Sequence, residues 1–117
     1  MVTDNICTIS LIDAYNKETK TAQFLVKESN CFYASCHFQE PGLIEHFIQS
    51  ISMAIESKYT IMEIKDFSVF FLPKCGETIV TDIKLMPSKK GISNVLATAK
   101  IDGVVAAKCK IRINLNN

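Results

Sequence analysis

The residues best suited to chemistry are gathered in the stretch from Cys36 to Glu56. This stretch contains both histidines of the 117-residue chain, His37 and His46, together with the carboxylate of Glu45. Cys36 beside His37 suggests a thiolate nucleophile with a base close by. Side chains of adjacent residues usually point apart, however, and free cysteines are mostly structural. We therefore interpret Cys36 as a small hydrophobic residue and regard His37, Glu45 and His46 as the candidates for chemistry.

An amphipathic helix is predicted to position these candidates. Pro41 suits a first helical turn, because its missing N–H needs no partner there, and Glu40 suits the positive end of the helix dipole. Apolar residues follow at positions 43, 44, 47, 48, 51, 54 and 55, the spacing of a helix with a broad buried face. The N-terminus of such a helix stabilises negative charge, so the start of this helix is where an anionic intermediate would be held.

Composition limits the classes of function. A length of 117 residues indicates a single domain over residues 1–117. The net charge is +1 without any basic run, which argues against nucleic-acid binding. No apolar run approaches the ~20 residues of a membrane span, and the first residues lack the basic region of a signal peptide. We expect a cytoplasmic protein that does not bind membranes.

The cysteines support neither a disulfide framework nor a metal centre. The chain has five of them, an odd number, and none form a Cys-x-x-Cys pair. We interpret them all as reduced small hydrophobic residues, and we expect no metal site and no cofactor.

The remaining sequence predicts strands. Residues 7–13 and 21–27 form a predicted hairpin, and residues 28–40 form a packed loop that leads into the helix. Further strands are predicted at 61–72, 77–86, 92–101 and 104–115, and Asp102-Gly103 is typical of a type I′ turn between the last two. Strand 61–72 has apolar residues on both faces, so it is buried on both sides or covered by another subunit. One helix can cover six strands only if the sheet curls, which predicts an α+β fold with a six-stranded bent antiparallel sheet wrapped around one long central helix.

Three groups of residues resemble the hot-dog fold, and within it the 3-hydroxyacyl-acyl-carrier-protein dehydratases. The first group is His37-Phe38, Pro41-Gly42 and the Glu45-x-x-x-Gln49 spacing. The second is Phe67 with Pro73-x-x-Gly76-Glu77. The third is Lys89-Lys90-Gly91-Ile92 followed by Ala99-x-x-Asp102-Gly103-x-x-Ala106-Ala107. Together they span roughly residues 7 to 115.

The resemblance implies an enzyme, a lyase that removes water from a 3-hydroxyacyl thioester in fatty-acid, polyketide or polyene synthesis. By this resemblance, His37 is the base, Glu45 is the acid and the free N–H of Gly42 binds the thioester oxygen. Gln49 and His46 have supporting roles, and Phe67, Val69 and Phe71 line an acyl tunnel.

The resemblance also implies partners. The acyl group is carried by acyl carrier protein or coenzyme A, and the active site is shared between two subunits whose sheets join edge to edge. The segment between His37 and Glu45 is shorter than in most of the family. It is similar to that of the dehydratase-like proteins of aryl-polyene and flexirubin pigment clusters, some of which work in mixed pairs. A homodimer and a hot-dog heterodimer are both compatible with this.

Two other functions are compatible with the same residues. One is a hot-dog thioesterase in which Glu45 attacks the thioester or activates water against it. The other is a catalytically silent acyl-binding subunit that completes a heterodimer.

The site residues also have structural interpretations. Glu45 is then an ordinary charge in the first helical turn, and His37 is a packed loop residue. His46 is a polar helix residue near the dimer interface, and Gln49 and Ser50 bond across paired helices. The aromatic residues from Phe67 onward are core residues.

Overall fold

The computed structural model describes residues 9–87 and 89–115. Within these residues, strands surround one helix, α1 (Glu40–Ala54). The strands are β1 (Ala14–Asn16), β2 (Thr21–Leu25), β3 (Tyr33–Ala34), β4 (His37–Phe38), β5 (Tyr59–Val69), β6 (Thr78–Leu85), β7 (Ile92–Ile101) and β8 (Val104–Leu115). Of the described residues, no helix has the length and apolarity needed to cross a bilayer.

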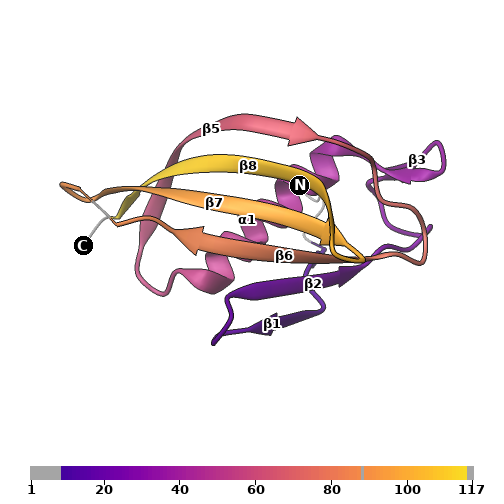
Figure 1. The fold of residues 1–117 in the computed structure, drawn as a ribbon, viewed down its shortest axis with the longest axis horizontal. Coiled ribbons are helices and arrows are strands. Elements are labelled where there is room, and N and C mark those ends of the chain that lie inside the picture. The colour runs from indigo at the N-terminus through magenta and orange to yellow at the C-terminus, as the bar shows by residue number, and fades with distance from the viewer. Residues whose placement is uncertain (1–8, 88, 116–117) are drawn as a thin grey trace, which may run out of the picture.

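Six of these strands form one antiparallel sheet in the order β1-β2-β6-β7-β8-β5. Figure 1 shows the sheet curving across α1, which lies against a single face of it. β3 and β4 form a separate two-stranded hairpin before the helix. The predicted α+β arrangement of one helix against a bent six-stranded antiparallel sheet is confirmed.

The core lies between α1 and the inner face of the sheet. Strand β7 alternates strictly between buried and half-buried positions, as expected for a strand with one buried face. The helix contributes large side chains with no exposed area, and much of the facing sheet contributes small ones. The large ones are Leu43, Phe47 and Ile51, and the small ones are Ala97, Ala99, Ala106 and Ala107. The alanines leave room for the helix to lie close to the sheet.

The prediction for the N-terminal strand was wrong in position. The strand that pairs with β2 is Ala14–Asn16, which had been assigned to the connection. Residues 9–13 are not a strand, and residues 7 and 8 lie outside the described residues. The physical reason is that the N–H and C=O groups of Leu11 are bonded to helix side chains instead of to a neighbouring strand.

The strand after the helix is an edge strand. Among the described strands, β5 pairs only with β8, and it contains irregularities after Ile61 and after Lys65. Several large apolar side chains on or just after it are exposed in the single chain: Met62, Ile64, Phe70 and Phe71. The alternative in which this strand is buried on both sides within its own chain was therefore wrong, and coverage by another subunit stays a prediction.

The turn between the last two strands has the predicted geometry. The connection between β7 and β8 consists of Asp102 and Gly103 at φ values of 50° and 80°, so the predicted turn with two positive φ angles is confirmed.

The cysteines are not all buried, because Cys31, Cys36 and Cys75 are exposed and only Cys109 of the described cysteines is buried. Burial raises the pKa of the Cys109 thiol to about 12, which keeps it protonated.

Candidate active site

The start of α1 is tightly packed. Pro41 lies in the first turn as predicted, and Gly42 is buried under two aromatic residues. A Cβ atom on Gly42 would lie 2.6 Å from Cζ of Phe38 and 2.7 Å from Cβ of Phe32. Glycine is therefore needed here for close approach of the helix to these rings.

The N–H of Gly42 is not free. It donates to the carbonyl oxygen of Gln39 at 2.9 Å, and the N–H of Leu43 donates to the same oxygen at 3.2 Å. The prediction of a free Gly42 donor is thus corrected, because the helix begins with a tight turn that uses this group. Pro41 has no N–H, so Glu40 supplies the remaining backbone donor of the first turn.

Glu45 lies one turn further along α1 and is half-buried. Its Oε2 atom accepts a hydrogen bond from Nε2 of Gln49 at 3.3 Å. Gln49 is held in turn by the N-terminal segment, since its Oε1 accepts the N–H of Leu11 at 2.6 Å and its Nε2 also donates to the carbonyl of Ile9 at 3.2 Å. The Leu11 N–H requires the amide oxygen at that position, so the Gln49 amide is oriented with its NH₂ group toward Glu45.

This arrangement corrects our structural interpretation of Gln49 and Ser50. Gln49 makes its hydrogen bonds within its own chain, and the Ser50 hydroxyl donates to the His46 carbonyl one turn earlier. Neither bond leads to a paired helix.

His46 is a core residue. It is fully buried, its Nδ1 lies 2.8 Å from the carbonyl oxygen of Leu11, and its Nε2 lies 2.8 Å from Oγ1 of Thr81 on β6. A carbonyl can only accept, so Nδ1 carries the proton and Nε2 accepts from the Thr81 hydroxyl. Burial lowers the pKa of His46 to about 4, so the ring is neutral at pH 7. The interpretation of His46 as a residue near the dimer interface was wrong, because its side chain is enclosed by its own chain.

His37 lies on β4, in the β3–β4 hairpin whose turn residues Ser35 and Cys36 have positive φ angles. Its Nδ1 is 3.0 Å from the Ser35 carbonyl, and its side chain is half-buried. Across the described residues, no hydrogen bond or ion pair joins His37 to Glu45. The described part of the chain therefore does not bring the two into direct contact.

The three predicted tunnel residues differ in environment. Phe67 packs edge-on against Phe47 of α1 with ring centroids 6.4 Å apart, so it borders the core. Val69 is partly buried against the same core, whereas Phe71 lies beyond the end of β5 and is 37% exposed. Phe67 and Val69 lie on the core side of β5, and Phe71 is at the surface.

The sequence analysis missed the contribution of the N-terminal segment and of Thr81. Thr81 was already on the inward face of its predicted strand with Ile79 and Ile83, which is a signal for a buried hydroxyl in search of a partner. Nothing in the pattern around Leu11 indicated that its backbone is bonded to two helix side chains. Among the described residues there is also no group of three or more His, Cys, Asp or Glu side chains placed to bind a metal ion.

The site therefore offers one half-buried carboxylate, oriented by an amide, near the start of a helix. A carboxylate in this position can act as a base toward water, as an acid toward a leaving group, or as a nucleophile.

The fold is similar to that of several solved protein structures. No family model and no curated protein sequence matches the chain. The fold is similar to a Streptococcus mutans protein bound to acetyl-CoA, with a TM-score of 0.76, 10% identity, and coverage of 97% of this chain and 98% of that one. It is also similar to a hypothetical thioesterase from Streptococcus pneumoniae solved with coenzyme A, with a TM-score of 0.77, 9% identity, and coverage of 93% and 94%.

A hexameric broad-specificity acyl-coenzyme A thioesterase is similar with a TM-score of 0.70 and 4% identity, covering 81% of this chain and 77% of that one. Identities this low establish the fold and not the activity. The similarity of the folds over most of each chain shows that this chain has the hot-dog fold.

Proposed function

We propose that this protein hydrolyses acyl-coenzyme A thioesters, with Glu45 as the carboxylate that acts on the thioester. The observation that carries the proposal is the Glu45–Gln49 hydrogen bond, which holds an otherwise unpaired carboxylate on α1. Hot-dog neighbours with coenzyme A or acetyl-CoA bound support the choice of carrier. The names of these neighbours also favour hydrolysis over the dehydration that the sequence motifs suggested.

The chemistry needs a base and an oxyanion donor. Glu45 takes a proton from water as the water oxygen attacks the thioester carbonyl, and the resulting oxyanion is stabilised by backbone N–H groups. When the intermediate collapses, the C–S bond breaks and the departing thiolate takes the proton from Glu45. Direct attack by Glu45 is the alternative route, and it would form an anhydride that water then hydrolyses. The Glu40 N–H is the first-turn donor for the oxyanion in this proposal, because the Gly42 N–H is already used.

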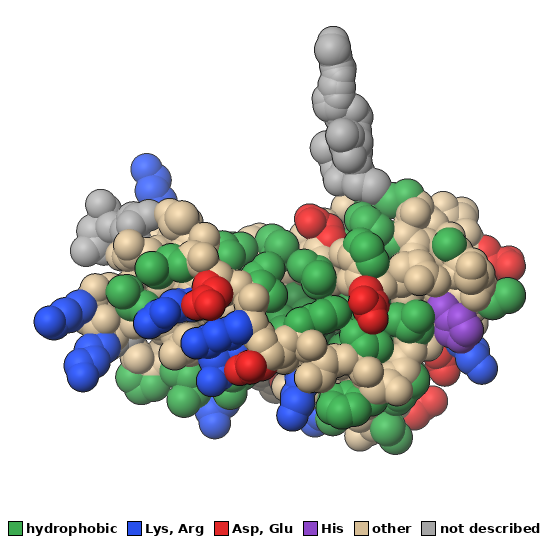
Figure 2. All heavy atoms as spheres, turned by 90° about the horizontal axis from the view of Figure 1, so that it is seen from above, with side chains coloured by type: hydrophobic (Ala, Val, Ile, Leu, Met, Phe, Trp, Pro, Cys, Tyr) green, Lys and Arg blue, Asp and Glu red, His purple; other side chains and the backbone are tan. Residues whose placement is uncertain are grey.

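The proposed active form is a dimer joined along β5. No other described strand pairs with the outer edge of β5, and Met62 and Ile64 on this strand are 50% and 36% exposed. Figure 2 looks onto this edge from above and shows hydrophobic side chains gathered across the middle of the face, among acidic and basic ones. An edge strand with exposed apolar side chains is a template for pairing with another chain. Such pairing would bring His37 of one subunit toward the helix of the other, in a homodimer or with a second hot-dog chain.

The proposal is tested by giving the purified protein short- and long-chain acyl-CoAs, a 3-hydroxyacyl-CoA and the corresponding 2-enoyl-CoA. Products should be separated by chromatography, because the exposed Cys31, Cys36 and Cys75 would themselves react with a thiol reagent. We expect release of free coenzyme A from saturated acyl-CoAs. The Glu45→Gln variant should lose at least ~100-fold in rate while its melting temperature stays near that of the original protein.

The matched control is Glu56→Gln, which removes an exposed carboxylate that lies just beyond α1 and forms an ion pair with Lys17. It should hydrolyse at the original rate. Interconversion of the 3-hydroxyacyl and 2-enoyl thioesters without thiol release would instead establish the dehydratase. Absence of both reactions, alone and with a second hot-dog subunit present, would establish the silent acyl-binding role and overturn the proposal.

A further inference from the structure

The outer face of the sheet is turned away from α1. Three lysines and one leucine lie in a row across four strands on this face. The strand register places Lys84 of β6 opposite Leu96 of β7, Leu96 opposite Lys110 of β8, and Lys110 opposite Lys65 of β5. Residues directly opposite on neighbouring strands project to the same side of a sheet. Lys84, Leu96, Lys110 and Lys65 therefore form one line, which we call the lysine row.

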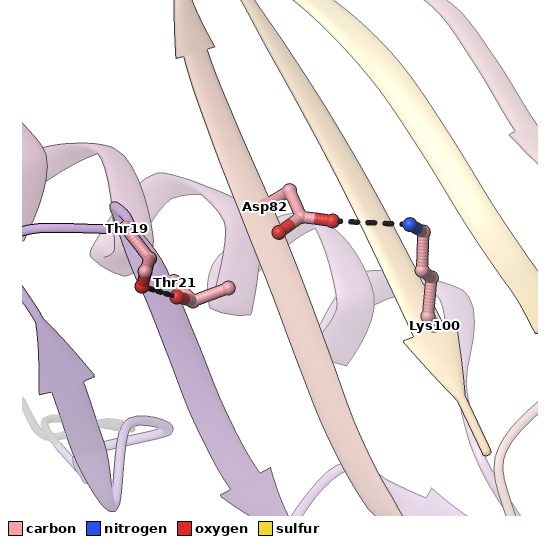
Figure 3. Close-up of polar contacts among 4 residues, drawn as sticks. All are labelled: Thr19, Thr21, Asp82 and Lys100. Atoms are coloured by element: carbon pink, nitrogen blue, oxygen red, sulfur yellow. Dashed lines mark hydrogen bonds and ion pairs between the residues drawn. The ribbon is translucent and has the colours of Figure 1, made fainter. Parts of the chain in front are cut away.

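Positive charge exceeds negative charge around the lysine row. Asp82 pairs with Lys100 at 3.3 Å, shown in Figure 3, and Glu63 pairs with Arg112 at 3.6 Å, which leaves Asp66 as the carboxylate beside Lys110. Within the described residues, none of the three lysines of the row forms an ion pair. Like charges directly opposite each other, as at Lys65 and Lys110, destabilise a sheet. The fold therefore tolerates an unfavourable contact on this face.

The face also has a hollow beside Leu96. Its walls are Leu96 and Thr98 of β7, Lys108 and Lys110 of β8, and Asp66 of β5. Asp66 has a φ angle of 55° and lies within the irregular part of β5 between Lys65 and Ser68, where the pairing with β8 shifts. An apolar side chain of a partner can enter this hollow next to Leu96, while the lysines beside it hold carboxylates.

We infer that the lysine row is a docking surface for an acidic helix of another protein. Neighbouring strands are ~4.8 Å apart, so the row presents Lys65, Lys110, Leu96 and Lys84 at about 0, 4.8, 9.6 and 14.4 Å. Positions i, i+3, i+7 and i+10 of a helix lie on one face at about 0, 4.5, 10.5 and 15 Å. A helix laid across the strands with carboxylates at i, i+3 and i+10 and an apolar residue at i+7 matches the row in both spacing and chemistry.

Other occupants fit less well. A second copy packed face to face would oppose one lysine row to another. Nucleic acid needs a basic surface that follows many phosphates, whereas the row has three lysines in a chain whose net charge is only +1. The docking surface is separate from Glu45, which lies on the helix against the opposite face of the sheet, so it stands whether or not the protein hydrolyses thioesters.

The test uses the whole protein and a fluorescent, side-chain-stapled helical peptide. The peptide carries Glu at i, i+3 and i+10 and Leu at i+7, and a second stapled peptide carries the same residues distributed around the helix. We expect anisotropy to show binding of the first peptide that weakens as salt is raised, and at least tenfold weaker binding of the second. The Lys84→Glu, Lys110→Glu double variant should weaken binding of the first peptide at least tenfold.

The control is the Lys27→Glu, Lys58→Glu double variant, which changes the net charge equally at exposed lysines outside the row. It should bind as the original protein does. A peptide with Lys in place of its Glu residues should bind the Lys84→Glu, Lys110→Glu variant better than the original protein. The inference is overturned if neither peptide binds, if both bind equally, if the control variant weakens binding as much, or if duplex DNA binds more tightly than the peptide.

Discussion

His46 is expected to make the protein lose stability as the pH falls below neutrality. The ring is fully buried between α1, the N-terminal segment and β6, where it donates to the Leu11 carbonyl and accepts from Thr81. Protonation would give the ring a second N–H, at Nε2, that points at the Thr81 hydroxyl, and it would place a charge in the core. The folded state therefore holds His46 neutral well below the pH at which an unfolded chain binds the proton.

The magnitude follows from the difference in pKa between the two states. The pKa of His46 is about 4 in the fold and 6.5 for an unperturbed histidine. Between these values the unfolded chain binds more protons, so the free energy of unfolding falls as the pH is lowered. The contribution of His46 to the free energy of unfolding is fully present above about pH 6.5. The loss of this contribution reaches about 2 kcal/mol at pH 5 and levels off near 3 kcal/mol below pH 4.

Urea unfolding followed by circular dichroism from pH 7.5 to pH 5 measures this loss. His46→Gln keeps a donor and an acceptor without a titrating group. Lowering the pH from 7.5 to 5 should therefore narrow the difference in free energy of unfolding between the original protein and this variant by about 2 kcal/mol. His37→Gln is the control, because His37 lies half-buried on the β4 hairpin, and it should keep the full pH dependence. The histidine NMR resonances of the native protein give an independent reading. Equal pH dependence in the original protein and His46→Gln, or a His46 pKa near 6.5 in the fold, would refute the reasoning.

Three further predictions concern packing, charge and assembly. Gly42→Ala should lower the free energy of unfolding by about 1–3 kcal/mol in urea titration, because its Cβ would overlap the Phe38 ring; an unchanged midpoint would show that the ring moves away freely. Lys110→Glu should raise the free energy of unfolding by about 0.2–1 kcal/mol, since it replaces a like-charge contact with Lys65 by an attractive one, and a loss of stability would contradict that register. Ile64→Lys should shift the protein from dimer to monomer in light scattering; a monomer already in the original protein would remove the shared-site proposal.

The fold was predictable because its signals are local and repeated. The apolar spacing of residues 43–55 marked α1, alternation marked β6 to β8, and Asp102-Gly103 marked the last hairpin. The first strand was misplaced for the opposite reason. The backbone groups of Leu11 are bonded to Gln49 and His46, which lie 38 and 35 residues away, and no local pattern encodes those contacts.

The candidate site was predictable only as a set of residues. The Glu45-x-x-x-Gln49 spacing put a carboxylate and an amide one turn apart on the predicted helix, but the hydrogen bond between them was not predicted. The burial of His46 and the use of the Gly42 N–H depend on how the helix start and the N-terminal segment pack, which the sequence pattern does not specify. In the proposed dimer, His37 and Glu45 come from different chains, and a pattern within one chain cannot describe such an arrangement.

The most direct measurement is a crystal structure of the protein with a non-hydrolysable acyl-CoA analogue in which a methylene replaces the thioester sulfur. We expect a dimer joined along β5, with a Glu45 carboxylate oxygen, or a water bonded to it, within ~3.5 Å of the analogue's carbonyl carbon. We also expect the Gln49–Glu45 hydrogen bond to be retained. An analogue bound with its carbonyl away from Glu45, or next to another carboxylate, would contradict the central claim.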